Sequence, residues 1–375
     1  MVWLALCSLF FYGYGNPKLL WLVCGSIVMN YAFGALVARG STDARRNLAL
    51  GVGAATNLLV LITFKYLAPT IALFRSLGLD QLPTLNIVLP LGISFYTFTQ
   101  IGYLIDRREG LAADLGPARY ALFVTFFPHL IAGPVLHVRE IGGQLSNPAT
   151  LRLRAESFAP GLAMFAIGLA KKVLIADPLG GVVADGYAHA QALSLIPAWI
   201  VIVGYSVELY FDFSGYSDMA VGLAGMFGMK FPLNFNSPYK ARDVIEYWQR
   251  WHMSLTHYLT LLLYNPLSTW IMRRRLARGL KVSGKALRDP LVFLSMVVMP
   301  TTYTMALAGV WHGAGLQFFV FGLIHAAYLS VNHAWRVFGK KPAASSSVIM
   351  RRVRTVLSVA VTYVAVLVPE TFFRA

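Results

Sequence analysis

The chain has 375 residues, of which 57% are hydrophobic and 13% are charged. Because soluble domains carry about 25% charged residues, this composition excludes an ordinary soluble domain and indicates an integral membrane protein. The formal net charge of +16 is assigned to short basic loops that face anionic lipid. No nucleic-acid partner is expected, since no nucleic-acid-binding module is recognisable.

Apolar stretches of membrane-spanning length recur along the whole chain. About 20 helical residues cross a hydrocarbon core, and the backbone in lipid must satisfy its own hydrogen bonds, which favours helices. The pattern predicts an all-α, polytopic bundle of transmembrane helices that forms one domain over residues 1–375. Spans are expected near residues 2–14, 19–38, 48–67, 86–105, 118–135, 158–176, 195–211, 255–272, 291–310, 316–337 and 353–373, with shorter re-entrant or interfacial pieces near 70–78 and 219–229.

Two basic loops predict the orientation of the chain. Residues 273–288 hold seven basic residues and no acidic one, and residues 336–354 hold six more. The positive-inside rule places both loops in the cytoplasm, so the hairpin 291–337 should begin and end there. Its turn, residues 311–315, should lie deep in the membrane or toward the outer face. Pro300 is expected to break the outgoing helix and keep the turn inside the bilayer.

Two histidines are candidates for chemistry. His312 lies in the turn Trp311-His312-Gly313-Ala314-Gly315, where an ionisable residue at membrane depth suggests a function. The neighbouring glycines would let another chain or a ligand approach the backbone. His252 follows an aromatic and basic stretch that, taken alone, favours an interfacial anchor.

Several other polar residues interrupt the apolar stretches. Asp212 and Asp218 need partners, because a buried unpaired carboxylate is costly, and Asp218 is a candidate cap for a helix that begins at Met219. No metal site is expected, since hard cations prefer several oxygen ligands. Residues 128–134 form a proline-bounded break of the kind that lines a cavity or packs on protein. Lys171-Lys172 is interpreted as a topology anchor.

The order of the motifs resembles the membrane-bound O-acyltransferase (MBOAT) family, and most closely the bacterial branch that O-acetylates alginate and related exopolysaccharides. The resemblance covers nearly the whole chain, with six motifs in the same order. They are Leu89-Pro90-Leu91-Gly92-Ile93-Ser94-Phe95-Tyr96-Thr97-Phe98, residues 128–134, residues 210–218, Asn234-Phe235-Asn236-Ser237-Pro238-Tyr239, residues 248–255, and Gly309-Val310-Trp311-His312-Gly313-Ala314.

The resemblance implies a central funnel or tunnel with His312 at its centre and His252 as a second catalytic histidine. It implies a multi-pass enzyme of the bacterial inner membrane that moves an acyl group, in this branch acetyl, to a hydroxyl outside the cytoplasm. The donor would be acetyl-coenzyme A or another acyl thioester, and no bound cofactor is expected. The further partners would be membrane lipids and a periplasmic acyltransferase or the polysaccharide acceptor. No residue is assigned to donor binding.

Three features depart from the family pattern. The chain appears shortened at both ends, since the family has an earlier helix and continues beyond the segment that ends here at Ala375. An Arg-Asp pair of the family is replaced by Thr260 and Leu261, which affects any donor or partner contact that the pair makes.

The residues themselves agree with acyl transfer. A neutral imidazole can take the proton of a hydroxyl that attacks a thioester, and we assign this role to His312. Direct transfer is favoured, since no Ser or Cys nucleophile stands in a recognisable elbow. The alternatives that stay open are a transporter or flippase, an inactive scaffold of an export complex, and, among enzymes, teichoic-acid D-alanylation or peptidoglycan O-acetylation.

Overall fold

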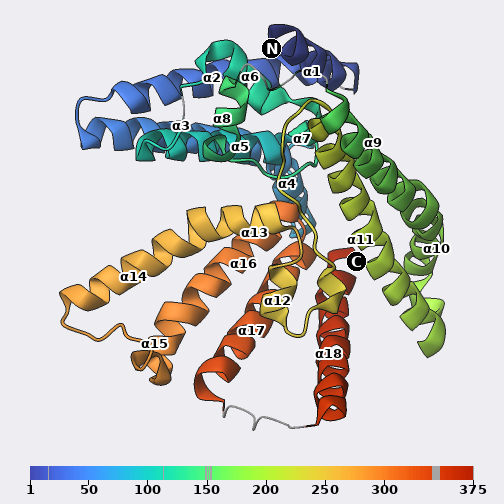
Figure 1. Ribbon diagram of the computed structural model, residues 1–375. Helices are drawn as coiled ribbons and strands as arrows, with labels where there is room; N and C mark the ends of the chain where they lie inside the picture. Colours follow the sequence, from blue (N-terminus) through green and yellow to red (C-terminus); the bar gives the residue numbers. More distant parts are fainter. Residues whose placement is uncertain are drawn as a thin grey trace. The chain divides into compact units, whose positions relative to one another are not determined.

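Helices make up all the regular structure in the described part of the chain (Figure 1). The computed structural model describes residues 1–375 except 16, 113, 148, 149, 151, 153, 340–346 and 375. The all-α prediction is therefore confirmed. Two of the basic residues counted above, Lys340 and Lys341, lie outside the described residues. The central funnel and the single domain stay predictions.

The chain divides into two compact units. The first comprises Met1–Leu174 and Asp212–Leu233, and the second comprises Ile175–Phe211 and Asn234–Ala375. The helices of the first part of the chain are α1 (Val2–Gly15), α2 (Leu20–Arg39), α3 (Asp43–Lys65), α4 (Leu67–Ser76), α5 (Ile93–Glu109), α6 (Gly116–Thr125), α7 (Phe127–Leu130), α8 (Val138–Ser146) and α9 (Ala155–Ala170). They are followed by α10 (Asp177–Ala188), α11 (Leu195–Met226), α12 (Val244–Trp248), α13 (Met253–Leu259), α14 (Asn265–Ala277), α15 (Pro290–Phe293), α16 (Met299–His312), α17 (Leu316–Phe338) and α18 (Val348–Arg374).

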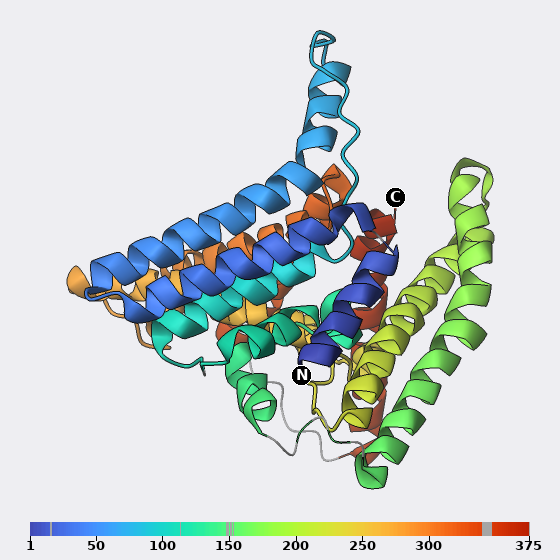
Figure 2. The ribbon, with the colours of Figure 1, turned by 90° about the horizontal axis from the view of Figure 1, so that it is seen from above.

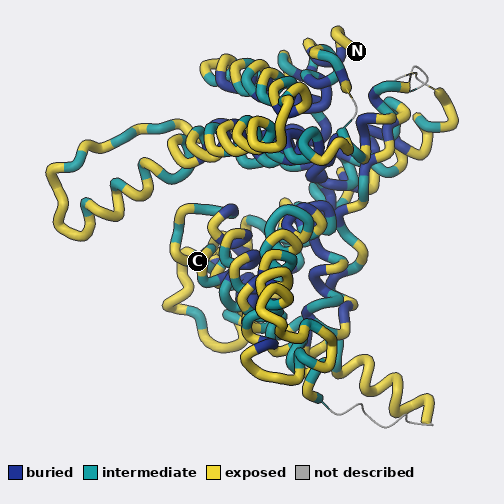
Figure 3. The backbone as a smooth tube through the Cα atoms, turned by 90° about the vertical axis from the view of Figure 1, so that its left-hand side faces the viewer, coloured by how far each residue is buried: buried dark blue, intermediate teal, exposed yellow. Residues whose placement is uncertain are grey.

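Among the described residues, six helical segments are long and apolar enough to cross a membrane, namely Pro17–Arg39, Asp43–Lys65, Ala155–Ala188, Leu195–Met226, Pro290–His312 and Val348–Arg374. Many of their large apolar side chains face outward, as the exposed stretches in Figure 3 show. Leu59 of α3 and Val361 of α18 are examples, at 63% and 67% exposure. Such surfaces suit lipid rather than water. The protein is a multi-pass membrane protein.

Two predicted spans are shorter than expected. The span near 86–105 begins only at Ile93, because residues 83–90 are not helical. Pro83 and Pro90 bound that stretch, and proline lacks the N–H that a helix interior requires. The span near 118–135 ends at Thr125, and the short helix α7 follows. The expected break near residues 128–134 is confirmed. Gly92, at φ 69°, lies against the backbone there, since a Cβ would come within 2.5 Å of the Leu130 carbonyl oxygen.

Prolines in three long helices follow a π-helical turn. The turns Lys171–Ala176, Thr260–Tyr264 and Leu294–Val298 end two residues before Pro178, Pro266 and Pro300. A π turn widens the helix, which relieves the clash between a proline ring and the preceding turn. The helix therefore continues through Pro300, and the prediction that this residue breaks it was wrong.

Helix α11 runs unbroken through residues that were expected to separate two segments. Asp218 lies inside it and caps nothing, contrary to prediction. Within the first unit, Lys171 pairs with Asp218 and Lys172 pairs with Asp212. The expectation that both carboxylates have partners is confirmed, and the two lysines act as those partners.

Close glycine contacts join α9 to the end of α11 in the first unit, where the two helices lie side by side (Figures 1 and 2). A Cβ on Gly168 would come within 2.5 Å of the Gly215 carbonyl oxygen, and a Cβ on Gly161 within 2.7 Å of that of Gly222. The glycines are seven residues apart on each helix, so both contacts fall on one face. Small residues of this kind let membrane helices approach closely.

The second unit contains the predicted hairpin, formed by α15, α16 and α17. Its two ends meet, since the rings of Phe293 and Phe338 lie 5.3 Å apart. Near its turn, Gly309 and Gly322 face each other, and a Cβ on either would lie within 2.3 Å of a carbonyl oxygen of the opposite helix. The hairpin prediction is confirmed. The close contact between the two glycines holds the end of α16 against α17.

Candidate active site

His312 is the last residue of α16, at the turn of the hairpin. Gly313 continues in extended conformation, and α17 begins at Leu316. A Cβ on Gly313 would lie 2.0 Å from the Phe318 ring, and one on Gly315 would lie 2.0 Å from the Gln317 side chain. Side chains of this same turn therefore occupy the space beside both glycines, which we had expected to admit another chain or a ligand.

The His312 ring is half-buried among aromatic side chains. Its centroid lies 4.8 Å from that of Trp311, 5.0 Å from that of Phe373 and 5.8 Å from that of Phe321. Phe373 belongs to α18 and Phe321 to α17, so three helices of the second unit surround the imidazole. Residue 312 as a whole is partly buried.

His252 lies at the start of α13 in the left-handed backbone region, with φ 43° and ψ 53°. Few residues other than glycine adopt this conformation, although histidine does so more often than most. The segment is held by Asn234, whose carbonyl accepts the Met253 N–H and whose side chain accepts from the Ser254 hydroxyl at 2.6 Å. Such conformations cluster at functional sites, where the surrounding structure over-determines them.

His252 is buried, with 2% of its surface exposed. It is therefore no surface anchor, which was the interpretation favoured by its immediate neighbours. Burial, together with the nearby His312, lowers the pKa of His252 to about 3. The imidazole is neutral near pH 7 for this reason. Its ring lies 6.5 Å from that of Trp311, the residue next to His312. The structure thus brings together the two histidines that the sequence singled out, and their catalytic roles stay predictions.

Sequence reasoning gave no role to His325, which is buried in α17. The Trp248 indole nitrogen donates to its Nδ1 at 3.3 Å, and the Tyr247 ring stacks on it at 6.1 Å. These contacts join α17 to the segment that leads to His252. The signal available was its place 13 residues after His312 in an apolar helix, where a histidine needs a partner.

Glu370 was also missed. It lies in α18, one turn before Phe373, and is 2% exposed. The Tyr239 hydroxyl lies 3.2 Å from its Oε1 and 2.8 Å from the Ser206 carbonyl oxygen, so one proton is shared between two acceptors. Tyr239 stacks on Tyr247. A lone carboxylate in an apolar terminal stretch is an expensive feature, and this was the signal that could have found it.

A cavity of about 260 Å³ lies within the second unit, and neither His252 nor His312 is among the residues that line it. Its walls include Thr256, one helical turn after His252, and Met305, two turns before His312. Thr260, at one of the two positions that depart from the family pattern, also lines it. The lining is apolar with several hydroxyl groups. Among the residues that the structure describes, no group of three or more His, Cys, Asp or Glu is placed to hold a metal ion.

Comparison with known proteins bears on the family of the chain. Residues 104–282 match the membrane-bound O-acyltransferase family model. The chain is 37% identical to the peptidoglycan O-acetyltransferase of Helicobacter pylori, over 89% of this chain and 64% of that protein. It is 37% identical to the probable alginate O-acetylase AlgI of Pseudomonas syringae, over 88% of this chain and 60% of that protein. A more distant match, 27% identical over 75% of this chain and 67% of the other, is the teichoic acid D-alanyltransferase of Bacillus subtilis.

The chain spans about three fifths of the length of the first two of these relatives. The family model begins within α5 and ends after α14, so it includes four of the six motifs and leaves out residues 89–98 and 309–314. The fold, the membrane helices and these matches agree with one another. The chain belongs to the membrane-bound O-acyltransferase family, and its relatives include alginate O-acetylases.

Proposed function

We propose that the protein is an O-acyltransferase that moves an acetyl group from a cytoplasmic thioester to a hydroxyl of an exopolysaccharide outside the cytoplasm. The observation that carries the proposal is His312, which is half-buried at the hairpin turn and close to a buried neutral histidine. The peptidoglycan and alginate acetyltransferases among the relatives support acetyl as the group transferred.

The chemistry proceeds by direct transfer. The acceptor hydroxyl attacks the thioester carbonyl carbon, and His312 takes the hydroxyl proton as the new C–O bond forms. The tetrahedral intermediate then breaks its C–S bond, and the thiolate leaves with the bonding electron pair. The imidazolium of His312 returns the proton to the thiolate, so the enzyme ends in its starting state. The products are an O-acetyl ester and free coenzyme A.

His252 takes a supporting role in this proposal. A neutral imidazole donates one hydrogen bond and accepts another, so it can orient the acceptor hydroxyl or the carbonyl oxygen. The cavity lined by Thr256 and Met305 has the volume for an acyl group and part of its thioester arm. The coenzyme head group carries several negative charges and would stay near the basic residues 273–288, on the cytoplasmic side.

Purified protein in detergent or liposomes with radiolabelled acetyl-coenzyme A provides the test. We expect label to appear on alginate oligosaccharides and free coenzyme A to appear in equal amount. Peptidoglycan fragments are offered in parallel, because the relatives include an enzyme named for that acceptor. Label on peptidoglycan alone would change the acceptor and keep the reaction. Absence of both label transfer and coenzyme release, in a folded preparation with the periplasmic partner supplied, would refute the enzyme in favour of a transporter or scaffold.

A further inference from the structure

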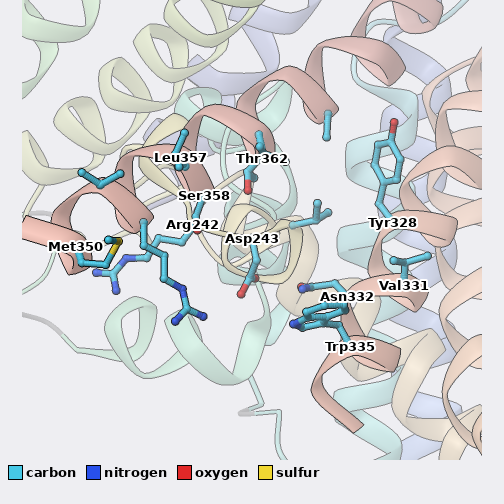
Figure 4. Close-up of a pocket in the computed structure, with 15 residues that line it drawn as sticks. Arg242, Asp243, Tyr328, Val331, Asn332, Trp335, Met350, Leu357, Ser358 and Thr362 are labelled. Carbon is cyan, nitrogen blue, oxygen red and sulfur yellow. The ribbon is translucent and has the colours of Figure 1, made fainter. Parts of the chain in front are cut away.

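A groove of about 840 Å³ runs between α17 and α18 within the second unit (Figure 4). Helix α17 contributes Tyr328, Val331, Asn332 and Trp335, which recur at the spacing of a single helix face. Helix α18 contributes residues at the same spacing from Met350 to Ala365. The groove therefore runs parallel to the two helices, and its walls are mostly apolar.

Positive charge gathers at one end of the groove. Its lining includes Arg242, in the segment before α12, and Arg354, in the second turn of α18. Both side chains are exposed. Neither lies within ion-pair distance of a described carboxylate, although the charge of Arg242 helps to lower the pKa of Glu246. The groove thus combines two available guanidinium groups at one end with apolar walls along its length.

The carboxylates near that end are already neutralised. Asp243, which also lines the groove, pairs with Arg336 at 2.7 Å. Glu246 pairs with Arg250 at 2.7 Å and accepts the backbone N–H of residue 242. The two ion pairs contain two arginines and two carboxylates, and Arg242 and Arg354 add two more positive charges. Four positive and two negative charges leave a local excess of +2.

The basic first turns of α18 would place this end of the groove at the level of phospholipid head groups. Helix α18 is a candidate span whose first turns are basic and whose later turns are apolar. Trp335, 72% exposed, stands at the basic end of α17, and tryptophan is enriched at the membrane–water interface. Asn332 accepts the Ile245 N–H with its amide oxygen at 3.3 Å, which leaves its amide nitrogen as a donor.

We propose that this groove binds one anionic phospholipid, with its phosphate at Arg242 and Arg354 and its acyl chains along Leu357 and Val361. Any apolar groove in a membrane collects lipid, so the proposal rests on the charge. Arginine pairs with phosphate through two parallel hydrogen bonds, and basic pockets between membrane helices bind acidic head groups. A zwitterionic lipid has the same chains and would lose this selectivity.

Native mass spectrometry of the whole purified chain tests the proposal. Phosphatidylglycerol and phosphatidylcholine with identical acyl chains are titrated separately, and adducts that survive detergent removal are counted. We expect phosphatidylglycerol to bind at least tenfold more tightly. Each of R242Q and R354Q should weaken its binding about fivefold, and the double variant about 25-fold, as about 1 kcal/mol for each basic residue at an anionic lipid surface predicts.

R352Q is the matched control, because Arg352 is exposed in the same part of α18 and does not line the groove. It should leave phosphatidylglycerol binding within about twofold of the parent. L357W keeps both arginines and fills the groove, so it should also reduce binding, and thermal melting in detergent shows that each variant is folded. Equal binding of the two lipids, an unchanged double variant, or competition by free glycerol phosphate at the lipid's own concentration would each overturn the proposal.

Discussion

Replacing His312 is the sharpest test of the proposed chemistry. Loss of a general base lowers a rate by about 10²–10⁴-fold, which corresponds to about 3–5 kcal/mol of transition-state stabilisation. We expect H312A and H312Q to lose acetyl transfer by that factor. Glutamine keeps most of the volume between Phe321 and Phe373 and can donate a hydrogen bond, but it cannot take a proton. The two variants should therefore be similarly inactive if proton transfer is the function.

The surroundings of His312 determine how much its replacement lowers the stability of the fold. His312 is half-buried at a helix end, and its ring contacts are aromatic. Truncation to alanine should cost about 1 kcal/mol of stability, the usual size for such a site. That is too small to explain a hundredfold loss of rate in a protein that is still folded. F373L is a matched control, since it alters the packing against the imidazole and leaves the base in place. It should lower transfer less than tenfold.

The assay is release of coenzyme A together with label transfer, measured beside thermal melting in detergent. Donor binding, measured separately with a non-hydrolysable thioether analogue, should stay within about threefold of the parent in H312Q, because His312 is assigned to the reaction rather than to the donor. If H312A retains more than about a third of parental transfer, far above the range for a lost base, His312 is not the base. A large loss in F373L equal to that in H312A would point to packing instead.

Three further predictions concern other parts of the chain. H252N, which tolerates the left-handed backbone, should reduce turnover and leave some activity. Because burial lowers the pKa of His252 to about 3, only the unfolded chain protonates this side chain as the pH falls below about 6.5. His252 should therefore contribute up to about 1.4 kcal/mol per pH unit to the decline of parental stability, and H252N should remove that contribution in melting experiments. D218N leaves Lys171 unpaired and should destabilise the protein by about 3 kcal/mol, without abolishing transfer in the folded fraction; normal melting with dead enzyme would make the carboxylate catalytic. Cysteines placed within residues 273–288 should resist an impermeant thiol reagent on spheroplasts, and rapid labelling would invert the topology.

The hairpin 291–337 shows what a sequence can predict well. Two basic loops and two apolar stretches were enough to place its ends together, and the 5.3 Å contact between the Phe293 and Phe338 rings agrees. The rule works because lipid leaves the backbone few alternatives. The same reasoning failed at Pro300, where local sequence predicts a break. A proline in an apolar stretch does not by itself show whether the helix breaks or widens into the π turn that accommodates the ring here.

Long-range partners were the main gap. Asp212 and Asp218 suggested an interruption because carboxylates and glycine disfavour an apolar helix. Their partners, Lys172 and Lys171, lie 40 and 47 residues earlier in the chain, and neither local pattern indicates the pairing. Glu370 was passed over for the same reason, since Tyr239 lies 131 residues before it. The cost of an isolated charge signals that a partner exists, but it does not say which residue supplies it.

The position of the candidate base depends on backbone contacts more than on its own side chain. Gly309 and Gly322 let α16 and α17 touch backbone to backbone, three residues before His312. A methyl group at Gly322 would lie 2.3 Å from the Met305 carbonyl oxygen, so the helices would separate and carry the imidazole away from Phe373. His252 is placed differently, through Asn234 and a left-handed backbone at the start of α13. His312 and His252 are thus held in place by separate backbone contacts. Proton transfer over a fixed short distance requires rigid placement of this kind.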